Sequence, residues 1–214
     1  MEKTNRKGFT LAEVLATLVI LGVLAAITMG IIAPKIQDAQ NKTKFKSVYS
    51  DLAQVTSQIA ADNGNTLKGV FISDDVFRDK FAQYLNTIKS CNTGQALGNC
   101  WHANGNSKWL NGTSITGLSN RASIILNNGV LLRFGVDSSN CTALFGTVMA
   151  CGGINLDING FKGPNIYGKD IYGVWIEEKG IKPVGTKGDG RENTCTISGQ
   201  GNGCAAKVLK GEDY

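Results

Sequence analysis

Apolar residues follow three different patterns along the chain, and each pattern predicts a different structure. After eight mainly polar residues, an almost unbroken apolar run extends to residue 34. Apolar residues then recur every three or four positions, and further on they form short segments separated by glycine-rich turns. The first pattern suits lipid, the second is typical of an amphipathic helix and the third of β-strands. We therefore expect an anchor, a helical continuation and a folded head.

The apolar run is long enough to cross a membrane as a helix. Twenty residues without a charge extend from Val14 to Ala33. A helix rises ~1.5 Å per residue, so this run spans roughly 30 Å, the thickness of the hydrocarbon core of a bilayer. Lys3, Arg6 and Lys7 precede it, and basic residues favour the cytoplasmic side. We expect the short polar leader before the run to lie in the cytoplasm and the chain from about Lys35 to lie outside.

Two other interpretations of the run compete with this one. A secretory signal has a shorter apolar stretch, of about 7–15 residues, and a small-residue cleavage site, which residues 25–30 (AAITMG) match poorly. A simple signal-anchor fits the length but gives no role to Glu13. A carboxylate in such a segment costs on the order of 2–3 kcal/mol on insertion scales and is usually functional. The remaining alternative is that the Glu13 side chain has no such role and merely extends towards the lipid headgroups.

The residues around Glu13 resemble a known signal. Residues 7–15, KGFTLAEVL, are similar to the class III signal of type IV prepilins and of the pseudopilins of type II secretion. The resemblance covers roughly residues 6–35. It implies that a membrane prepilin peptidase cuts between Gly8 and Phe9 and methylates the new amino terminus on Phe9. Gly8 has no side chain, which lets a protease approach the bond closely.

The same resemblance implies a role for Glu13 in assembly. Cleavage leaves a free amine on Phe9, which the Glu13 carboxylate of a neighbouring subunit can approach in a filament of staggered helices. Opposite charges attract strongly at low dielectric, which offsets their burial cost. The expected partners are the prepilin peptidase, identical or related pilin subunits in a helical filament, the cytoplasmic membrane and the filament assembly platform. We expect a single-pass membrane precursor and then an extracellular or periplasmic filament.

The remaining pattern predicts an α+β fold, in which one long helix packs on an antiparallel β-sheet head, and the pilin resemblance implies the same. The apolar stripe of the amphipathic half is Phe45, Val48, Leu52, Val55 and Ile59. A coiled-coil seam is a weaker interpretation, because the stripe lasts only about two heptads. Pro34 should weaken the helix, and Asp62-Asn63-Gly64 should end it. The expected regions are a cleaved leader (1–8), a transmembrane and assembly helix (9–34), its amphipathic continuation (35–63) and a globular head (64–214).

Within the head, the pattern predicts a second helix and several strands. Ser73 should cap a helix that runs to about Lys89. The sequence Asn127-Asn128-Gly129 is a hairpin signal between two apolar segments. The expected strands are 122–126, 130–134, 154–158, 170–176 and 181–184.

Six cysteines in an exported head favour disulfides. They fall into three local pairs separated by 8, 9 and 8 residues: Cys91 and Cys100, Cys141 and Cys151, and Cys195 and Cys204. Six cysteines allow fifteen connectivities, among which the sequence does not choose, although we favour local pairing. No CxxC or HxxxH spacing occurs and His102 is the only histidine, so we expect no zinc site.

Calcium binding has a weak signal in residues 157–170. Asp157, Asn159 and Asp170 could supply oxygen ligands, as loops in some pseudopilin heads do. The spacing is not that of an EF-hand, and Asx-type turns explain the segment better. No other cofactor is expected.

Catalysis and nucleic-acid binding have no sequence signal. The chain has no nucleophile motif, P-loop or dinucleotide fingerprint, so we expect no enzyme. Its net charge of +5 is scattered, which argues against nucleic-acid binding. We interpret Trp101, Trp109 and Trp175 as core or loop anchors. The sequence thus favours a structural subunit, a pilin or pseudopilin, with a monomeric membrane-anchored extracellular ligand-binding domain as the alternative.

Overall fold

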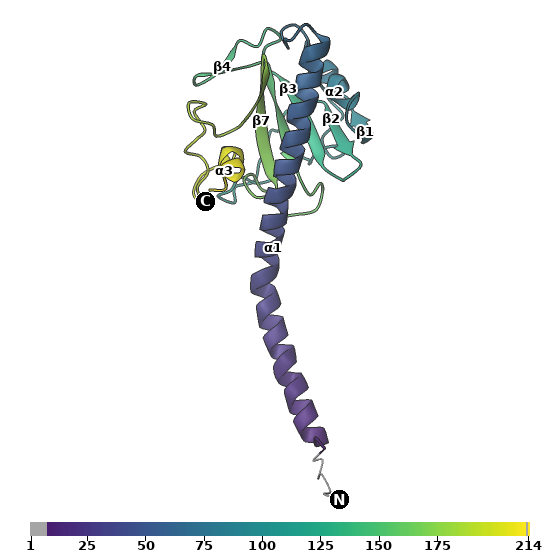
Figure 1. The fold of residues 1–214 in the computed structure, drawn as a ribbon, viewed down its shortest axis with the longest axis vertical. Helices are drawn as coiled ribbons and strands as arrows, with labels where there is room; N and C mark the ends of the chain where they lie inside the picture. The colour runs from purple at the N-terminus through teal and green to yellow at the C-terminus, as the bar shows by residue number, and fades with distance from the viewer. Residues whose placement is uncertain (1–7, 213) are drawn as a thin grey trace, which may run out of the picture. The chain divides into compact units, whose positions relative to one another are not determined.

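The computed structural model describes residues 8–212 and 214 and separates the chain into two units, Met1–Gln40 and Asn41–Tyr214. Residues 1–7, most of the expected leader, lie outside the described residues. Helix α1 (Leu11–Asp62) begins in the first unit and ends in the second (Figure 1). It ends where the sequence predicts, and Gly64 follows with φ of 72°, a left-handed conformation that favours glycine.

The described apolar side chains of the first unit are exposed on all sides of the helix. The exposed large apolar residues are Phe9, Leu11, Val14, Leu15, Leu18, Val19, Ile20, Leu21, Val23, Leu24, Ile27, Met29, Ile32 and Ile36. The Thr17 and Thr28 hydroxyls each donate to a backbone carbonyl of the preceding turn at 2.9 Å, so neither needs water as a partner. Of the described helices, only α1 is long and apolar enough to cross a membrane, judged by length and composition.

Helix α1 continues through Pro34. Proline has no N–H, so the carbonyl of Gly30, four residues earlier, loses its usual helical donor. We expected this loss to weaken the helix locally. The helix nevertheless continues without a break, because the turns on both sides hold the segment helical across the one lost bond.

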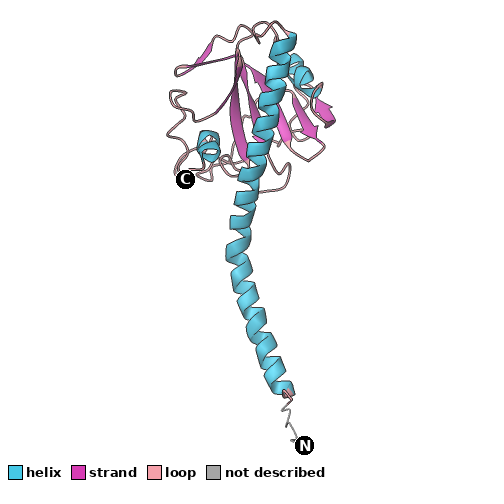
Figure 2. Ribbon diagram, viewed as in Figure 1, coloured by secondary structure: helices cyan, strands magenta, loops and turns pink. Residues whose placement is uncertain are grey.

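The second unit is an α+β head built on a six-stranded antiparallel sheet, which confirms the predicted fold class (Figure 2). The strand order is β1-β2-β3-β6-β7-β8. These strands are β1 (Thr87–Cys91), β2 (Ser123–Leu126), β3 (Leu131–Val136), β6 (Gly152–Asp157), β7 (Ile171–Glu177) and β8 (Gly180–Pro183). Strands β4 (Ala143–Phe145) and β5 (Val148–Ala150) form a separate hairpin, and helix α3 (Cys204–Lys210) lies near the end of the chain.

The predicted hairpin is confirmed, and the predicted second helix is too long. Strands β2 and β3 pair across Asn127-Asn128-Gly129, where Gly129 has φ of 81°. Helix α2 (Asp74–Ala82) has Ser73 as its N-cap but ends well before Lys89. The following residues turn and form β1, which pairs with β2 at the sheet edge. Sheet pairing therefore overrides the helical spacing of the apolar residues there, which leaves Ile88 68% exposed.

The second part of α1 covers one face of the sheet. Side chains alternate between the two faces of a strand, so Phe134 of β3 and Ile154 of β6 join the core beneath the helix. Phe45 of α1 stacks on Tyr172 of β7 with ring centroids 4.3 Å apart. The predicted stripe faces this core, and all five of its residues are buried.

Loops and the β4–β5 hairpin cover parts of the opposite face. Leu131 and Ile171 alternate away from the main core and form a second apolar cluster with Trp101. Trp175 and Val184 form a third cluster with residues of β5. The outer face of the sheet is thus only partly apolar.

Each of the three disulfides joins two cysteines that are consecutive along the chain. They are Cys91–Cys100, Cys141–Cys151 and Cys195–Cys204. The first closes the loop after β1, the second encloses the β4–β5 hairpin, and the third ties a loop to the first residue of α3. Closing a loop of this length stabilises a fold by roughly 2–3 kcal/mol in the chain-entropy model.

Candidate processing and assembly site

The Gly8–Phe9 bond, where we expect cleavage, lies in exposed backbone immediately before α1. Residues 8–10 are not helical, and the helix starts at Leu11. Phe9 is 88% exposed, and a Cβ added at Gly8 would meet no atom within 4 Å. Exposed irregular backbone is where proteases cut most readily. The fold of the chain therefore leaves this bond accessible.

Thr10 and Glu13 close the start of α1 with reciprocal hydrogen bonds. The Glu13 backbone N–H donates to the Thr10 hydroxyl at 3.3 Å, and the Thr10 N–H donates to Glu13 Oε2 at 2.8 Å. The Thr10 hydroxyl also donates to Oε2, at 2.9 Å. This arrangement is a capping box, in which T-x-x-E satisfies N–H groups that the start of a helix leaves without partners.

The capping box gives Glu13 a local partner that was not predicted. The signal was present, because TLAE at residues 10–13 directly precedes the apolar run and has the spacing of a capping box. The box uses only part of the carboxylate. Among the described residues, donors reach Oε2 alone, whereas a carboxylate offers about four acceptor positions. Oε1 of Glu13 is therefore available to a donor from another molecule.

A family model describes this same segment. The model for the prokaryotic N-terminal methylation motif matches residues 3–29. The chain carries the class III signal of type IV prepilin-like proteins. No curated protein and no solved structure matched the chain. The class III signal includes Gly8, Phe9 and Glu13, whereas the whole head lies beyond the matched residues.

The class III signal indicates how the chain is processed and assembled. It implies processing of a precursor by a peptidase and filament assembly with pilin subunits. Together with the exposed apolar helix, it fits a membrane-anchored precursor. The matched residues end before the head, so the site candidates of the head rest on geometry.

One group of polar residues is buried in the head near the end of β6. His102 Nε2 and Asp157 Oδ2 are 2.8 Å apart, and the two residues are 2% and 0% exposed. The rings of Trp101 and Phe161 contact the imidazole edge-on. Burial raises the pKa of Asp157 to about 6, while the hydrogen bond with His102 acts in the opposite direction.

The weak candidates for calcium ligands lie in this region and take part in local hydrogen bonds. Asp157 Oδ1 accepts the Asn159 N–H at 3.1 Å, which is the bond of an Asx turn. Asp170 accepts the N–H groups of Ile166 and Asn165 at 2.6 and 2.7 Å. Among the residues that the structure describes, no group of three or more His, Cys, Asp or Glu is arranged to hold a metal ion. Calcium binding by Asp157, Asn159 and Asp170, the less favoured interpretation of this segment, is not tested by these contacts.

The three tryptophans occupy core and loop positions, and two of them also line a cavity. Trp101 is 0% exposed and Trp175 is 5% exposed. Trp109 packs against Tyr167 with ring centroids 4.8 Å apart. Trp109 and Trp175 also line a cavity on the outer face of the sheet. Their interpretation as anchors alone is therefore incomplete.

Proposed function

We propose that the protein is a structural subunit, a pilin or pseudopilin, of a type IV pilus-like or type II secretion-type filament. The observation that carries this proposal is the class III signal at residues 3–29. It is supported by an adjoining helix whose apolar side chains are exposed on every side. Such a surface is satisfied only by lipid or by other apolar helices. The membrane holds the precursor, and the filament then surrounds the same side chains with neighbouring helices.

Processing removes the leader without disturbing the helix. A prepilin peptidase cuts before Phe9 and methylates the new terminus. Because Thr10 is the first residue of the capping box, the whole box stays on the mature chain. The mature subunit thus begins with an amine, one apolar residue and a helix that is already capped.

Glu13 then recruits subunits by binding the amine of a neighbour through Oε1. The local cap occupies Oε2, so capping and pairing between subunits use different oxygens of one carboxylate. In an apolar bundle the amine and the carboxylate attract each other strongly, and each reduces the cost of burying the other. A helix inserted out of register leaves both charges unpaired.

Two variants of Glu13 separate its charge from its capping role. Glu13→Gln keeps a side chain that can complete a capping box but removes the negative charge, whereas Glu13→Ala removes both. We expect both variants to be cut by the peptidase and to fail to enter filaments. Intact mass measures processing, with a chain that starts at methylated Phe9 as the expected product, and the sedimented filament fraction measures assembly.

The outcomes distinguish this proposal from a monomeric membrane-anchored binding domain. Normal assembly of Glu13→Gln, with loss only in Glu13→Ala, would show that Glu13 serves as a cap and not as a charge. A wild-type chain that keeps Met1 in cells containing the peptidase, and that never sediments with filaments, would favour the monomeric domain.

A further inference from the structure

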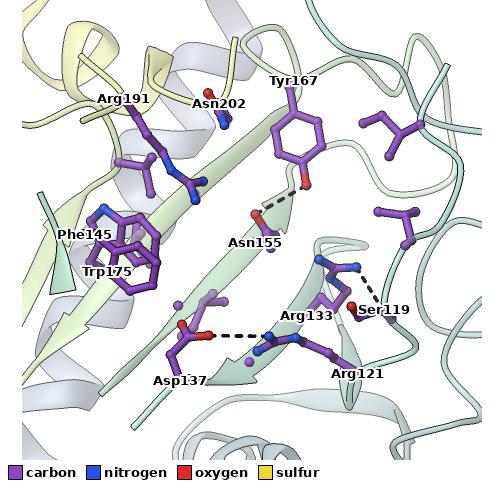
Figure 3. Close-up of a pocket in the computed structure, with 18 of the residues that line it drawn as sticks. Ser119, Arg121, Arg133, Asp137, Phe145, Asn155, Tyr167, Trp175, Arg191 and Asn202 are labelled. Atoms are coloured by element: carbon purple, nitrogen blue, oxygen red, sulfur yellow. Dashed lines mark hydrogen bonds and ion pairs between the residues drawn. The ribbon is translucent and has the colours of Figure 1, made fainter. Parts of the chain in front are cut away.

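A cavity of about 390 Å³ lies on the outer face of the sheet, opposite the main core (Figure 3). Two neighbouring positions on its floor carry no side chain, because Gly135 of β3 pairs with Gly153 of β6. On its other side, Gly153 pairs with Trp175 of β7. A Cβ at Gly135 would overlap the guanidinium of Arg121, and one at Gly153 would lie 3.4 Å from the Trp175 ring. The glycines therefore lower the floor and let larger side chains lie across it.

The cavity carries an excess of positive charge. Arg121 comes from the loop before β2, Arg133 from β3 and Arg191 from the loop after β8, and all three line the cavity. Asp137 is the one acidic residue in this lining, and it pairs with Arg121 at 3.5 Å. Within the described part of the chain, Arg133 and Arg191 have no carboxylate within 4.0 Å. Two arginines thus face the cavity without a carboxylate in ion-pair contact.

Arg133 is buried without an ion pair among the described residues, and its guanidinium carbon lies 5.6 Å from the ring centroid of Trp101. The residue is only 9% exposed. Its Nη1 donates to the Ser119 carbonyl at 3.2 Å, and its Nε has no acceptor among the described groups. Burial lowers the pKa of Arg133, but a guanidinium keeps its charge in proteins. A buried cation without a counter-ion is costly, and an anion in the cavity would offset that cost.

Arg191 is held in place by an aromatic wall. Its guanidinium carbon lies 5.0 Å from the ring centroid of Trp175 and 5.9 Å from that of Phe145. These two rings stack on each other with centroids 3.9 Å apart. Cation–π contacts of this kind fix the plane of the arginine without using its N–H groups. In Figure 3, Asn155 lies between Arg191 and Arg133 on the floor of the same cavity.

We propose that this arginine pocket, centred on Arg133, Arg191 and Asn155, binds the acidic group of a small hydroxylated molecule, with an acidic sugar as the class that fits. The planar fork of an arginine matches the oxygens of a carboxylate or phosphate. Asn155, Asn202 and Ser119 place amide and hydroxyl groups around the charge, and these suit the hydroxyls of a sugar. The volume falls in the range of small-molecule sites. The pocket lies wholly in the head, so it is independent of the proposed filament role.

The test uses the full-length protein in detergent and three sugars that share one ring: glucose, glucuronate and glucose 6-phosphate. Calorimetry and tryptophan fluorescence measure binding, since Trp109 and Trp175 line the pocket. We expect saturable binding of one or both acidic sugars, with glucose at least about tenfold weaker because it leaves the arginines unpaired. The tighter acidic sugar distinguishes a carboxylate from a phosphate. Equal binding of glucose, or no binding of any of the three, overturns the proposal.

Variants then locate the site. Arg133→Gln should weaken binding by about thirtyfold or more, as expected when one partner of a buried charge pair is removed. Arg191→Gln should weaken it as well, and this residue is half-buried on a loop, so it serves as the test if Arg133→Gln does not fold. Lys179→Gln removes an exposed cation outside the pocket and should bind like the wild type. Unchanged affinity in Arg191→Gln overturns the assignment.

Discussion

The two units of the chain treat apolar side chains in opposite ways. In the first unit Leu18 and Val19 are 59% and 66% exposed, whereas in the head Phe45 and Phe134 are 0% exposed. An apolar surface that a chain leaves uncovered is satisfied by lipid or by other chains, while a buried core stabilises the chain itself. Substitutions in the first unit should therefore change what the chain joins, and substitutions in the head should change whether it folds.

The largest expected effect comes from the core of the head. Phe134→Ala should lower the free energy of unfolding by about 3–5 kcal/mol because it leaves a cavity between Phe77 and Phe81, whose ring centroids lie 5.3 and 5.6 Å from that of Phe134. All three tryptophans lie in the head. Urea unfolding of the full-length protein in detergent, followed by tryptophan fluorescence, therefore reports on the head alone.

Leu18→Ala is the matched control for this prediction. It also removes apolar atoms, but from a side chain that is 59% exposed. We expect the unfolding midpoint of the head to stay where it is in the wild type. A clear loss of head stability in Leu18→Ala would contradict the separation of the two units by burial.

The next effect in size is a pH dependence that belongs to the head. Burial is the main cause that raises the pKa of Asp157 to about 6 from an ordinary 3.8. Between these values the folded state keeps a proton that the unfolded chain has already lost. The stabilising contribution of Asp157 is therefore complete below about pH 4 and is lost as the pH rises through 6. A gap of about two pKa units corresponds to about 3 kcal/mol.

Asp157→Asn removes this titration and so isolates it. The charged or titratable groups that interact electrostatically with Asp157 are His102, Asp170, Lys44 and Tyr167. Between pH 4 and pH 7, we expect the stability difference between wild type and variant to shift in favour of the variant. Urea unfolding at several pH values measures it. A shift in favour of the wild type would show that His102 holds the carboxylate as an anion in the folded state.

The class III signal of the first unit was readable from the sequence because its parts are close together along the chain. Gly8, Phe9 and Glu13 form one short motif, and the helix after them is apolar on every side. Even the missed contact between Thr10 and Glu13 was readable from its spacing. Local chemistry with a fixed spacing is what a single sequence reports well.

The head was predicted only as far as its local patterns reach. Short apolar segments bounded by turn residues predicted β2, β3, β6, β7 and β8 close to their observed bounds. Strand β1 was taken for the end of a helix, because its pairing with β2 depends on residues far along the chain. The arginine pocket was not predictable for the same reason. Arg133 and Arg191 are distant in sequence, and only the sheet and its covering loops bring them together.

The smallest of these effects concerns the disulfides, which are confined to the head. Cys195 and Cys204 are 9 positions apart, and in the chain-entropy model closing such a loop is worth about 2.5 kcal/mol. Replacing both cysteines should lower the unfolding free energy of the head by about that amount. Alanine is the better replacement, because serine would place a hydroxyl at a position where Cys204 is 0% exposed, and a buried unpaired hydroxyl has its own cost.

A second disulfide tells whether chain entropy accounts for the loss. Cys141 and Cys151 are 10 positions apart, so the entropy model predicts nearly the same loss for the Cys141→Ala, Cys151→Ala double variant. Both pairs are buried in the main core, but Cys204 is also the first residue of α3, so only the first of the two pairs holds a helix in place. Equal losses, measured by the same urea unfolding, would support the entropic account. A much larger loss for Cys195 and Cys204 would place their contribution in the packing of α3.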